Sequence, residues 1–305
     1  MQQLRTQFQV GNTEKGQFSY IGLQIEQSHS GITIKQDSFS QKVQSMQSVD
    51  DVLSEQGSQL STADRKKFRS IVGQLNWAAR QTRPDLIFDV LELSMKFNNS
   101  TGADMNRARK VTKRLASLEV PVLFPSLGIM KSWYLLVMCD AGFANLSDRV
   151  SSGGGLVIFL VGSNGKCCPI VWKSNKIKRI VRSTLAAETL ILNEAVEYAI
   201  YVRAVAKEIL RHEADLPIEL WTDNRNAFRA ASSVTQVEDK QLRIDMASIK
   251  ETIEEESIVL KWCPGEEMLA DCLSKCGACS RKLLNVFVKG SIAGHFKENR
   301  FTGLF

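Results

Sequence analysis

The chain has 305 residues, of which 44% are hydrophobic and 24% are charged, and it carries a formal net charge of +6. This composition excludes a disordered or low-complexity chain and suits about two globular domains. The longest apolar stretches, 121–130 and 153–161, are shorter than the roughly 18 residues that span a bilayer, and the polar first residues do not form a signal peptide, so we expect no membrane partner and an intracellular protein, cytoplasmic or nuclear.

The first elements in chain order form a predicted β-hairpin. Apolar and polar residues alternate over 18–26 and again over 32–35, on both sides of a turn-rich break. A helix is expected from about Asp37, and the polar stretch 49–61 is expected to be a loop. The chain therefore begins with a small β unit.

Three helices are predicted next, from apolar positions that recur every three to four residues. They cover residues 62–82, 85–97 and 105–118. Pro121 and Pro125 follow, and there we place the linker that ends the first unit. The first domain is accordingly expected over residues 1–122.

The second unit, residues 130–278, begins with three predicted strands and a long helix. The strands cover 133–140, 154–160 and 170–172, and the helix covers 184–210. Further elements then alternate: a strand at 218–223, helices at 226–231 and 240–254, a strand at 258–262 and a closing helix at 266–272. This order predicts a mixed α/β fold, with a five-stranded mixed sheet flanked by helices.

The remaining residues, 279–305, form a tail that includes Leu283, Leu284, Val286 and Phe287. The tail either packs back on the second domain or stays loose. Seven cysteines, an odd number, argue against a disulfide framework and favour a reducing compartment. Cys272, Cys276 and Cys279 suggest zinc, but the nearest histidine lies beyond the usual spacing, so reduced thiols are our interpretation.

Basic residues are clustered in three places, 65–69, 107–114 and 173–182. One such cluster is more often a solvated face than a binding site. Three clusters in one chain, together with the positive net charge, favour a partner with a phosphate backbone.

Four acids lie at the ends of predicted core elements, where an uncompensated charge is costly. They are Asp140, Glu188, Asp223 and Asp271. Taken singly, Asp223 would serve as a helix N-cap and Asp140 as part of a turn. If they cluster, they repel one another, and hard divalent cations are the natural remedy, which implies magnesium or manganese.

The motifs around these acids read CDAGFA at 139–144, RSTLAAE at 182–188, WTDN at 221–224 and LADCLSK at 269–275. They are accompanied by SSGG at 151–154, WKSNK at 172–176 and KWCPGEE at 261–267. Together these motifs resemble the ribonuclease H domain of copia-type retrotransposon Pol polyproteins. The first unit, with YIGLQIE at 20–26, FRSIVGQL at 68–75 and TRPDL at 82–86, resembles the palm end and the thumb or connection of the same family's reverse transcriptase. The resemblance runs from about residue 5 to residue 278.

The resemblance implies an endonuclease that hydrolyses the RNA strand of RNA/DNA hybrids. It further implies that Asp140, Glu188, Asp223 and Asp271 hold two Mg²⁺ ions, with Asp140 bridging both and Asp271 the more exposed. Residues expected to contact the hybrid are Lys173, Lys176 and Lys178 at its backbone, and Ser183 and Asn224 at its sugars. For the lysines the alternative is a solvated side chain, and for Ser183 it is a helix cap.

Two family features are missing from the sequence. No Tyr-x-Asp-Asp polymerase motif is present, so no polymerase activity is expected from this chain, and a missing polymerase part is an expected partner. No histidine lies near Cys263, where many cellular ribonucleases H carry one that assists product release. The chain is interpreted as a gene model cut from a longer element, a decayed copy or a fragment retained by a host.

Three rival interpretations remain. A nucleic-acid-binding relic without activity would keep the fold, an integrase or transposase would use a similar acidic cluster, and a purely structural protein would expose the basic helices to solvent. The retained acids favour catalysis over a relic, and the TDN and LAD motifs argue against an integrase.

Overall fold

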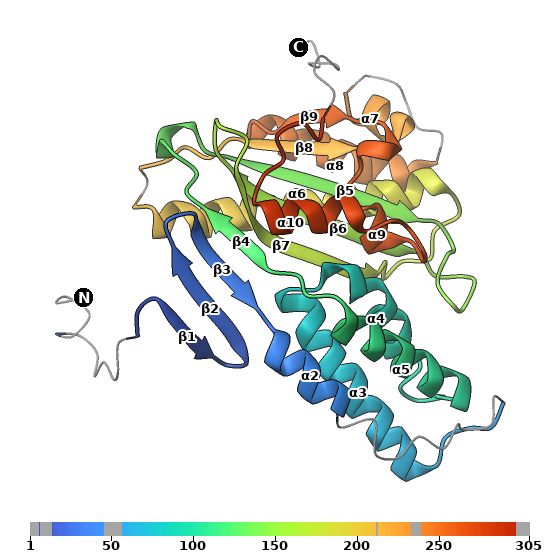
Figure 1. The fold of residues 1–305 in the computed structure, drawn as a ribbon. Coiled ribbons are helices and arrows are strands. Elements are labelled where there is room, and N and C mark those ends of the chain that lie inside the picture. Colours follow the sequence, from blue (N-terminus) through green and yellow to red (C-terminus); the bar gives the residue numbers. More distant parts are fainter. Residues whose placement is uncertain (1–5, 7–13, 46–56, 212, 233–238, 297–305) are drawn as a thin grey trace.

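The computed structural model describes residues 6, 14–45, 57–211, 213–232 and 239–296. A small antiparallel sheet and a group of helices lie beside a larger mixed sheet with helices on both faces (Figure 1). The mixed α/β class expected from the sequence is confirmed, including the five-stranded sheet of the second unit.

The N-terminal sheet is antiparallel and has the order β1-β2-β3-β4. Its strands are β1 (Gln17–Tyr20), β2 (Leu23–Ser28), β3 (Gly31–Lys35) and β4 (Val122–Pro125). The predicted single strand over 18–26 is wrong, because Ile21 and Gly22 both have positive φ and turn the chain back between β1 and β2. Two such residues make the tight turn that suits a two-residue hairpin.

The proline pair that we interpreted as a linker lies at strand β4. Val122 pairs with Ile34, and Pro125 with Gly31, so this segment completes the N-terminal sheet. A proline is tolerated there because β4 is an edge strand, whose outward groups need no partner. The domain limits at 122, 130 and 278 stay predictions, although a linker of free chain at 121–125 is ruled out.

The helices of the first unit pack into one bundle. They are α2 (Asp37–Ser45), α3 (Thr62–Gln81), η1 (Pro84–Leu86), α4 (Ile87–Ser94) and α5 (Gly102–Ser117). Ser61 caps α3, and Thr101 with Asp104 forms a capping box at the start of α5. The predicted helix over 85–97 is shorter than expected and begins with a 3-10 turn. Most of the predicted loop 49–61 lies outside the described residues.

The larger sheet has the order β7-β6-β5-β8-β9. Its strands are β5 (Tyr134–Gly142), β6 (Gly153–Val161), β7 (Cys167–Lys176), β8 (Ile218–Thr222) and β9 (Val259–Trp262), preceded by the short turn η2 (Met130–Ser132). The first three pair as antiparallel neighbours, whereas β8 runs parallel to β5 and to β9. Parallel β5 and β8 end at the same edge of the sheet, which decides where the candidate site lies.

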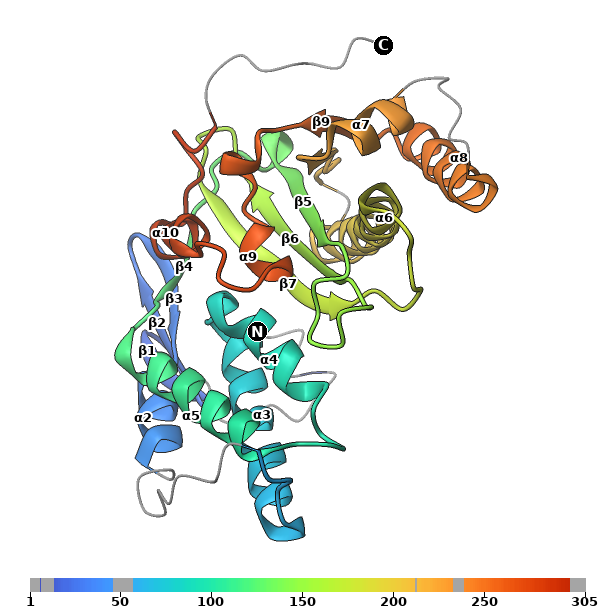
Figure 2. The ribbon, with the colours of Figure 1, turned by 90° about the vertical axis from the view of Figure 1, so that its right-hand side faces the viewer.

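Helices cover both faces of this sheet (Figure 2). On one face lie α6 (Thr184–Ile209) and α8 (Lys240–Glu255), with α7 (Arg225–Ser232) beside them. On the other lie η3 (Gly265–Glu267), α9 (Asp271–Ser274) and α10 (Arg281–Lys289). The predicted closing helix over 266–272 is therefore wrong, since the chain forms a 3-10 turn and then begins α9 at Asp271.

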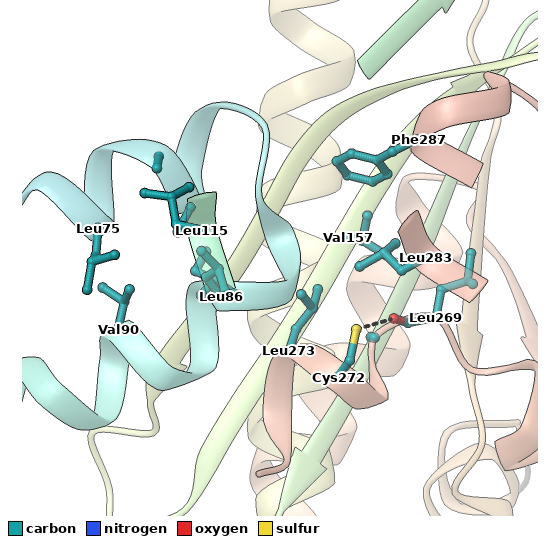
Figure 3. Packing of buried hydrophobic residues seen from close by; sticks show 14 of the residues in the cluster. Leu75, Leu86, Val90, Leu115, Val157, Leu269, Cys272, Leu273, Leu283 and Phe287 are labelled. Atoms are coloured by element: carbon teal, nitrogen blue, oxygen red, sulfur yellow. Dashed lines mark hydrogen bonds between the residues drawn. The ribbon is translucent and has the colours of Figure 1, made fainter. Parts of the chain in front are cut away.

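A continuous hydrophobic core joins the two units. Leu75, Leu86 and Val90 of the helical bundle belong to the same buried cluster as Val157 and Leu273 of the second unit (Figure 3). The indole N–H of Trp172 on β7 also donates to the carbonyl of Ala79 on α3, at 2.8 Å. The helical bundle therefore supports the sheet that carries the site.

The described part of the tail packs back on the larger sheet. Phe287 of α10 is fully buried, and its ring lies edge to face against Phe159 and Trp172, with centroids 6.1 Å and 5.0 Å apart. Residues 281–289 of the tail therefore pack back on the second domain, which was one of the two alternatives that the sequence left open. No described helix has the length and apolar character that a membrane-spanning segment requires.

Candidate metal centre

Three acids from different elements meet at the edge where β5 and β8 end. Asp140 lies near the end of β5, Asp223 directly follows β8, and Glu188 lies in the second turn of α6. One carboxylate oxygen of each comes within 4.8 Å of the others. The sequence placed each acid at the end of an element, and the parallel pairing of β5 with β8 brings two of those ends together.

The cluster is buried on the protein side and open on the other. Asp140 is 0% exposed and Glu188 4% exposed. Within the described residues, Oε2 of Glu188 is buried and has no hydrogen-bond partner. The acids line a cleft of about 620 Å³ that also includes Asn145, Thr184 and Asn224. An unpartnered buried carboxylate oxygen facing other carboxylates fits a bound cation.

The shared burial changes the proton affinity of these groups. Burial, followed by the charges of Asp140 and Asp223, raises the pKa of Glu188 to about 9. Burial and the charge of Asp140 raise the pKa of Asp223 to about 6. Burial also raises the pKa of Asp140, although the ammonium of Lys275 opposes the rise. The cluster therefore holds negative charge poorly unless a cation compensates it.

Asp271, the fourth predicted ligand, stands apart from the other three. It begins α9, and its Oδ1 lies 2.5 Å from Nζ of Lys275, one turn later. The same ammonium lies 3.0 Å from Oδ1 of Asp140. The side chain of Asp271 is 33% exposed, compared with 1% for Asp140, in line with its expected outer position.

Two residues that contact Asp140 had no assigned role in the sequence analysis, namely Ser274 and Lys275. Ser274 is fully buried, and its hydroxyl donates to Oδ2 of Asp140. Asn145, in the loop after β5, donates to the carbonyl of Ser274 at 2.7 Å and accepts from the N–H of Gly153 at 2.9 Å. Ser274 and Lys275 both lie in the LADCLSK motif, three and four residues after Asp271, and this helical spacing was the available signal.

The helix-capping role considered for Asp223 belongs to its neighbour. Oδ1 of Asn224 accepts from the backbone N–H groups of Asn226 and Ala227, at 3.0 Å and 2.9 Å, and so caps α7. Asp223 does not cap α7, so its carboxylate remains available to the acid cluster. Asn224 also lines the cleft, so its predicted place beside a bound sugar is sterically open.

The three predicted lysine contacts line a cleft other than the one that the acids line. Lys173 pairs with Glu194 and lies 3.0 Å from the hydroxyl of Tyr198, and Lys176 pairs with Asp148 at 3.3 Å. Lys178 is exposed. Ser183 caps α6 by accepting from the N–H of Ala186, the alternative named for it. Around β7 and α6 these lysines line a second cleft of about 550 Å³.

Sequence comparison finds similar proteins among retroelements. The chain is 27% identical over 213 residues to the retrovirus-related Pol polyprotein from transposon RE2 of Arabidopsis thaliana, which covers 70% of this chain and 14% of that protein. It is 31% identical over 118 residues to a protein of transposon Ty5-1 from Saccharomyces cerevisiae, covering 39% of this chain and 36% of that protein. The chain is a distant homologue of copia-type Pol polyproteins. No protein-family model matches it.

The match to the copia-type relatives is partial. The RE1 polyprotein of Arabidopsis thaliana gives a similar alignment, 26% identical over 213 residues, and again 14% of the relative is covered. The chain thus spans about a seventh of the length of these two copia-type polyproteins. The similarity to these relatives therefore concerns only that aligned part of them.

Comparison with solved structures finds a similar fold that covers most of this chain. The foamy viral protease-reverse transcriptase in complex with an RNA/DNA hybrid superposes with a TM-score of 0.50 at 15% identity, covering 82% of this chain and 30% of that one. A ribonuclease H1 from compost, also solved with an RNA/DNA hybrid, gives a TM-score of 0.35 at 20% identity over 46% of this chain and 93% of that one. The first match covers most of the chain and spans both of its units.

Proposed function

We propose that this chain is a ribonuclease H that hydrolyses the RNA strand of RNA/DNA hybrids as part of a copia-type retroelement polyprotein. The observation that carries the proposal is the convergence of Asp140, Glu188 and Asp223 within 4.8 Å, at one edge of a ribonuclease H-like sheet. Homology to copia-type Pol polyproteins and the similar fold of the foamy viral enzyme support it.

The donor set fits Mg²⁺, or Mn²⁺ in its place. Asp140, Glu188 and Asp223 offer carboxylate oxygens, which hard divalent cations prefer, and the unpartnered Oε2 of Glu188 gives one of these oxygens no other role among the described residues. Bound magnesium would lower the pKa of an attacking water and stabilise the leaving oxygen. We assign Asp271 to the outer side of the same centre, where its exposed carboxylate is open to solvent.

The chain's own residues would orient these groups. The Ser274 hydroxyl and the Lys275 ammonium hold the two oxygens of Asp140 in place. We further propose that Asn224, at the rim of the cleft, contacts the sugar that distinguishes RNA from DNA. Lys178, which is exposed, and Lys176, whose ion pair with Asp148 is more exposed than that of Lys173 with Glu194, would approach the phosphate backbone more readily than Lys173.

Cleavage of a labelled RNA/DNA hybrid tests the proposal. Purified protein with Mg²⁺ should cut the hybrid but not duplex DNA or duplex RNA, and Asp140→Asn should abolish cutting while the protein stays folded. The loss should be severe, since a carboxylate shared by the centre cannot be replaced by a neutral amide. A folded wild-type protein that binds the hybrid and does not cut it would instead identify a nucleic-acid-binding relic.

A further inference from the structure

The ammonium of Lys275 lies between two of the four acids, Asp140 and Asp271. Its Nζ is 3.0 Å from Oδ1 of Asp140 and 2.5 Å from Oδ1 of Asp271, so that it bridges the inner carboxylate and the outer one. Its positive charge also acts on Glu188 and Asp223, whose proton affinities it lowers. A single cationic side chain therefore counters part of the charge of all four acids.

The four acids differ in whether they already pair with a positively charged side chain. Glu188 and Asp223 make no ion pair with a lysine or arginine among the described residues, and Oε2 of Glu188 has no partner there. Asp271, in contrast, is already paired with Lys275. A divalent cation can join Asp140, Glu188 and Asp223 without displacing a positive charge from between them.

A cation bound by both Asp140 and Asp271 would encounter the ammonium of Lys275. Such an ion would need both oxygens at about 2.1 Å if it is magnesium. Those oxygens now contact Nζ of Lys275, which lies in the space between them. The ion and the ammonium would compete for the same ligands, and their positive charges would repel each other.

We propose that the Lys275 ammonium serves as a permanent positive charge in the metal centre. With this charge in place the protein binds one divalent ion tightly and a second ion weakly. The inference rests on the proposed metal centre and adds to it a positioning residue that controls ion number. Lysine suits this role because its ammonium is a compact charge on a flexible stem, and the side chain of Lys275 is 40% exposed, so it has room to move outward.

Calorimetric titration of the full chain with Mn²⁺, in the absence of nucleic acid, tests the proposal. The wild-type protein and Lys275→Arg, which keeps the charge, should bind one ion tightly and a second weakly. Lys275→Met should bind the second ion about tenfold more tightly or better. Lys289→Met, at an exposed lysine on α10, should behave like the wild type.

Several outcomes would overturn the inference, and they are distinguishable from failure of the proposed function. If the wild-type protein and Lys275→Met bind two ions with the same affinities, Lys275 does not control ion number, and the metal centre stands. If wild-type protein binds no ion and Asp223→Asn changes nothing, the metal centre itself fails, and the inference with it. Thermal unfolding of each variant, with Lys275→Gln as a second neutral substitution, separates loss of binding from loss of folding.

Discussion

Oε1 of Glu92 accepts a hydrogen bond from the backbone N–H of Ser147 at 2.9 Å, although 55 residues separate the two in sequence. Glu92 lies on α4 of the helical bundle, and Ser147 lies in the loop that follows β5. Asn145 of the same loop supports Ser274, which in turn donates to Asp140. Hydrogen bonds through this loop therefore connect the helical bundle with Asp140 of the candidate centre.

Removal of the Glu92 carboxylate should destabilise the protein. Glu92 is 6% exposed and also pairs with Arg107, at 3.3 Å, so Glu92→Ala removes the acceptor of the Ser147 N–H and leaves the Arg107 guanidinium with Asp89 alone. We expect a loss of about 2–3 kcal/mol in the free energy of unfolding, measured by urea denaturation. Glu119→Ala, at an exposed glutamate, should change it by less than about 0.5 kcal/mol. Equal effects of the two substitutions would contradict the role of Glu92.

Arg83 should be irreplaceable by lysine. This guanidinium is buried, pairs with Asp85 through two hydrogen bonds of 2.8 Å and 2.9 Å, and donates to the carbonyls of Leu115 and Leu118 at the end of α5. A lysine ammonium cannot make this planar set of contacts. Arg83→Lys should cost about 2–4 kcal/mol in the free energy of unfolding, and Arg80→Lys, on the exposed face of α3, should cost far less. A small effect at position 83 would show that one ammonium suffices there.

A methyl group added at Gly155 should lower the stability of the protein. A Cβ at Gly155 on β6 would lie 2.7–2.9 Å from atoms of Leu273 and Ser274, including backbone atoms of α9. Gly155→Ala should therefore push α9 outward, cost about 1–3 kcal/mol and weaken Mn²⁺ binding, because α9 carries Asp271. Gly73→Ala, on a helix face with no atom within 4 Å of the new Cβ, should stabilise the protein by up to about 1 kcal/mol. Thermal unfolding and Mn²⁺ titration of both variants provide the comparison.

The stability of the metal-free protein should fall as the pH rises. The pKa of Glu188 is about 9 in the folded chain, owing to burial and to the charges of Asp140 and Asp223, and about 4.3 in an unfolded one. Between these values the folded state binds more protons, so the stability from this group is full below pH of about 4.3 and is lost as the pH rises through about 9. The pKa of Asp223, about 6, shifts in the same direction, again through burial and Asp140, and adds a loss at lower pH.

Melting temperatures measured in a chelator from pH 5 to pH 9 should show this decline, and Glu188→Gln should reduce it. Magnesium must displace the proton that Glu188 holds, so the increase in melting temperature that it causes should be larger at pH 9 than at pH 6. A stabilisation by magnesium that does not depend on pH would indicate that the ion binds elsewhere.

Much of the fold was predictable because local patterns determined it. The run of apolar residues before Asp140 and the spacing of apolar residues in α3 led to the correct elements. The order of strands and helices in the second unit was also correct, apart from the closing helix over 266–272. One error arose where a long-range contact overrode a local signal. Pro121 and Pro125 indicated a linker, whereas pairing with β3, far back in the sequence, made residues 122–125 an edge strand.

By itself the sequence determined the kinds of elements and the four acids at their ends, because hydrophobic periodicity and charge are local properties. The tertiary structure decided which acids meet. Parallel pairing of β5 with β8 brings Asp140 to Asp223, α6 adds Glu188, and the short helix α9 places Lys275 between Asp140 and Asp271. These are distances between segments far apart in the chain, and they depend on the packing of the whole sheet rather than on any local pattern.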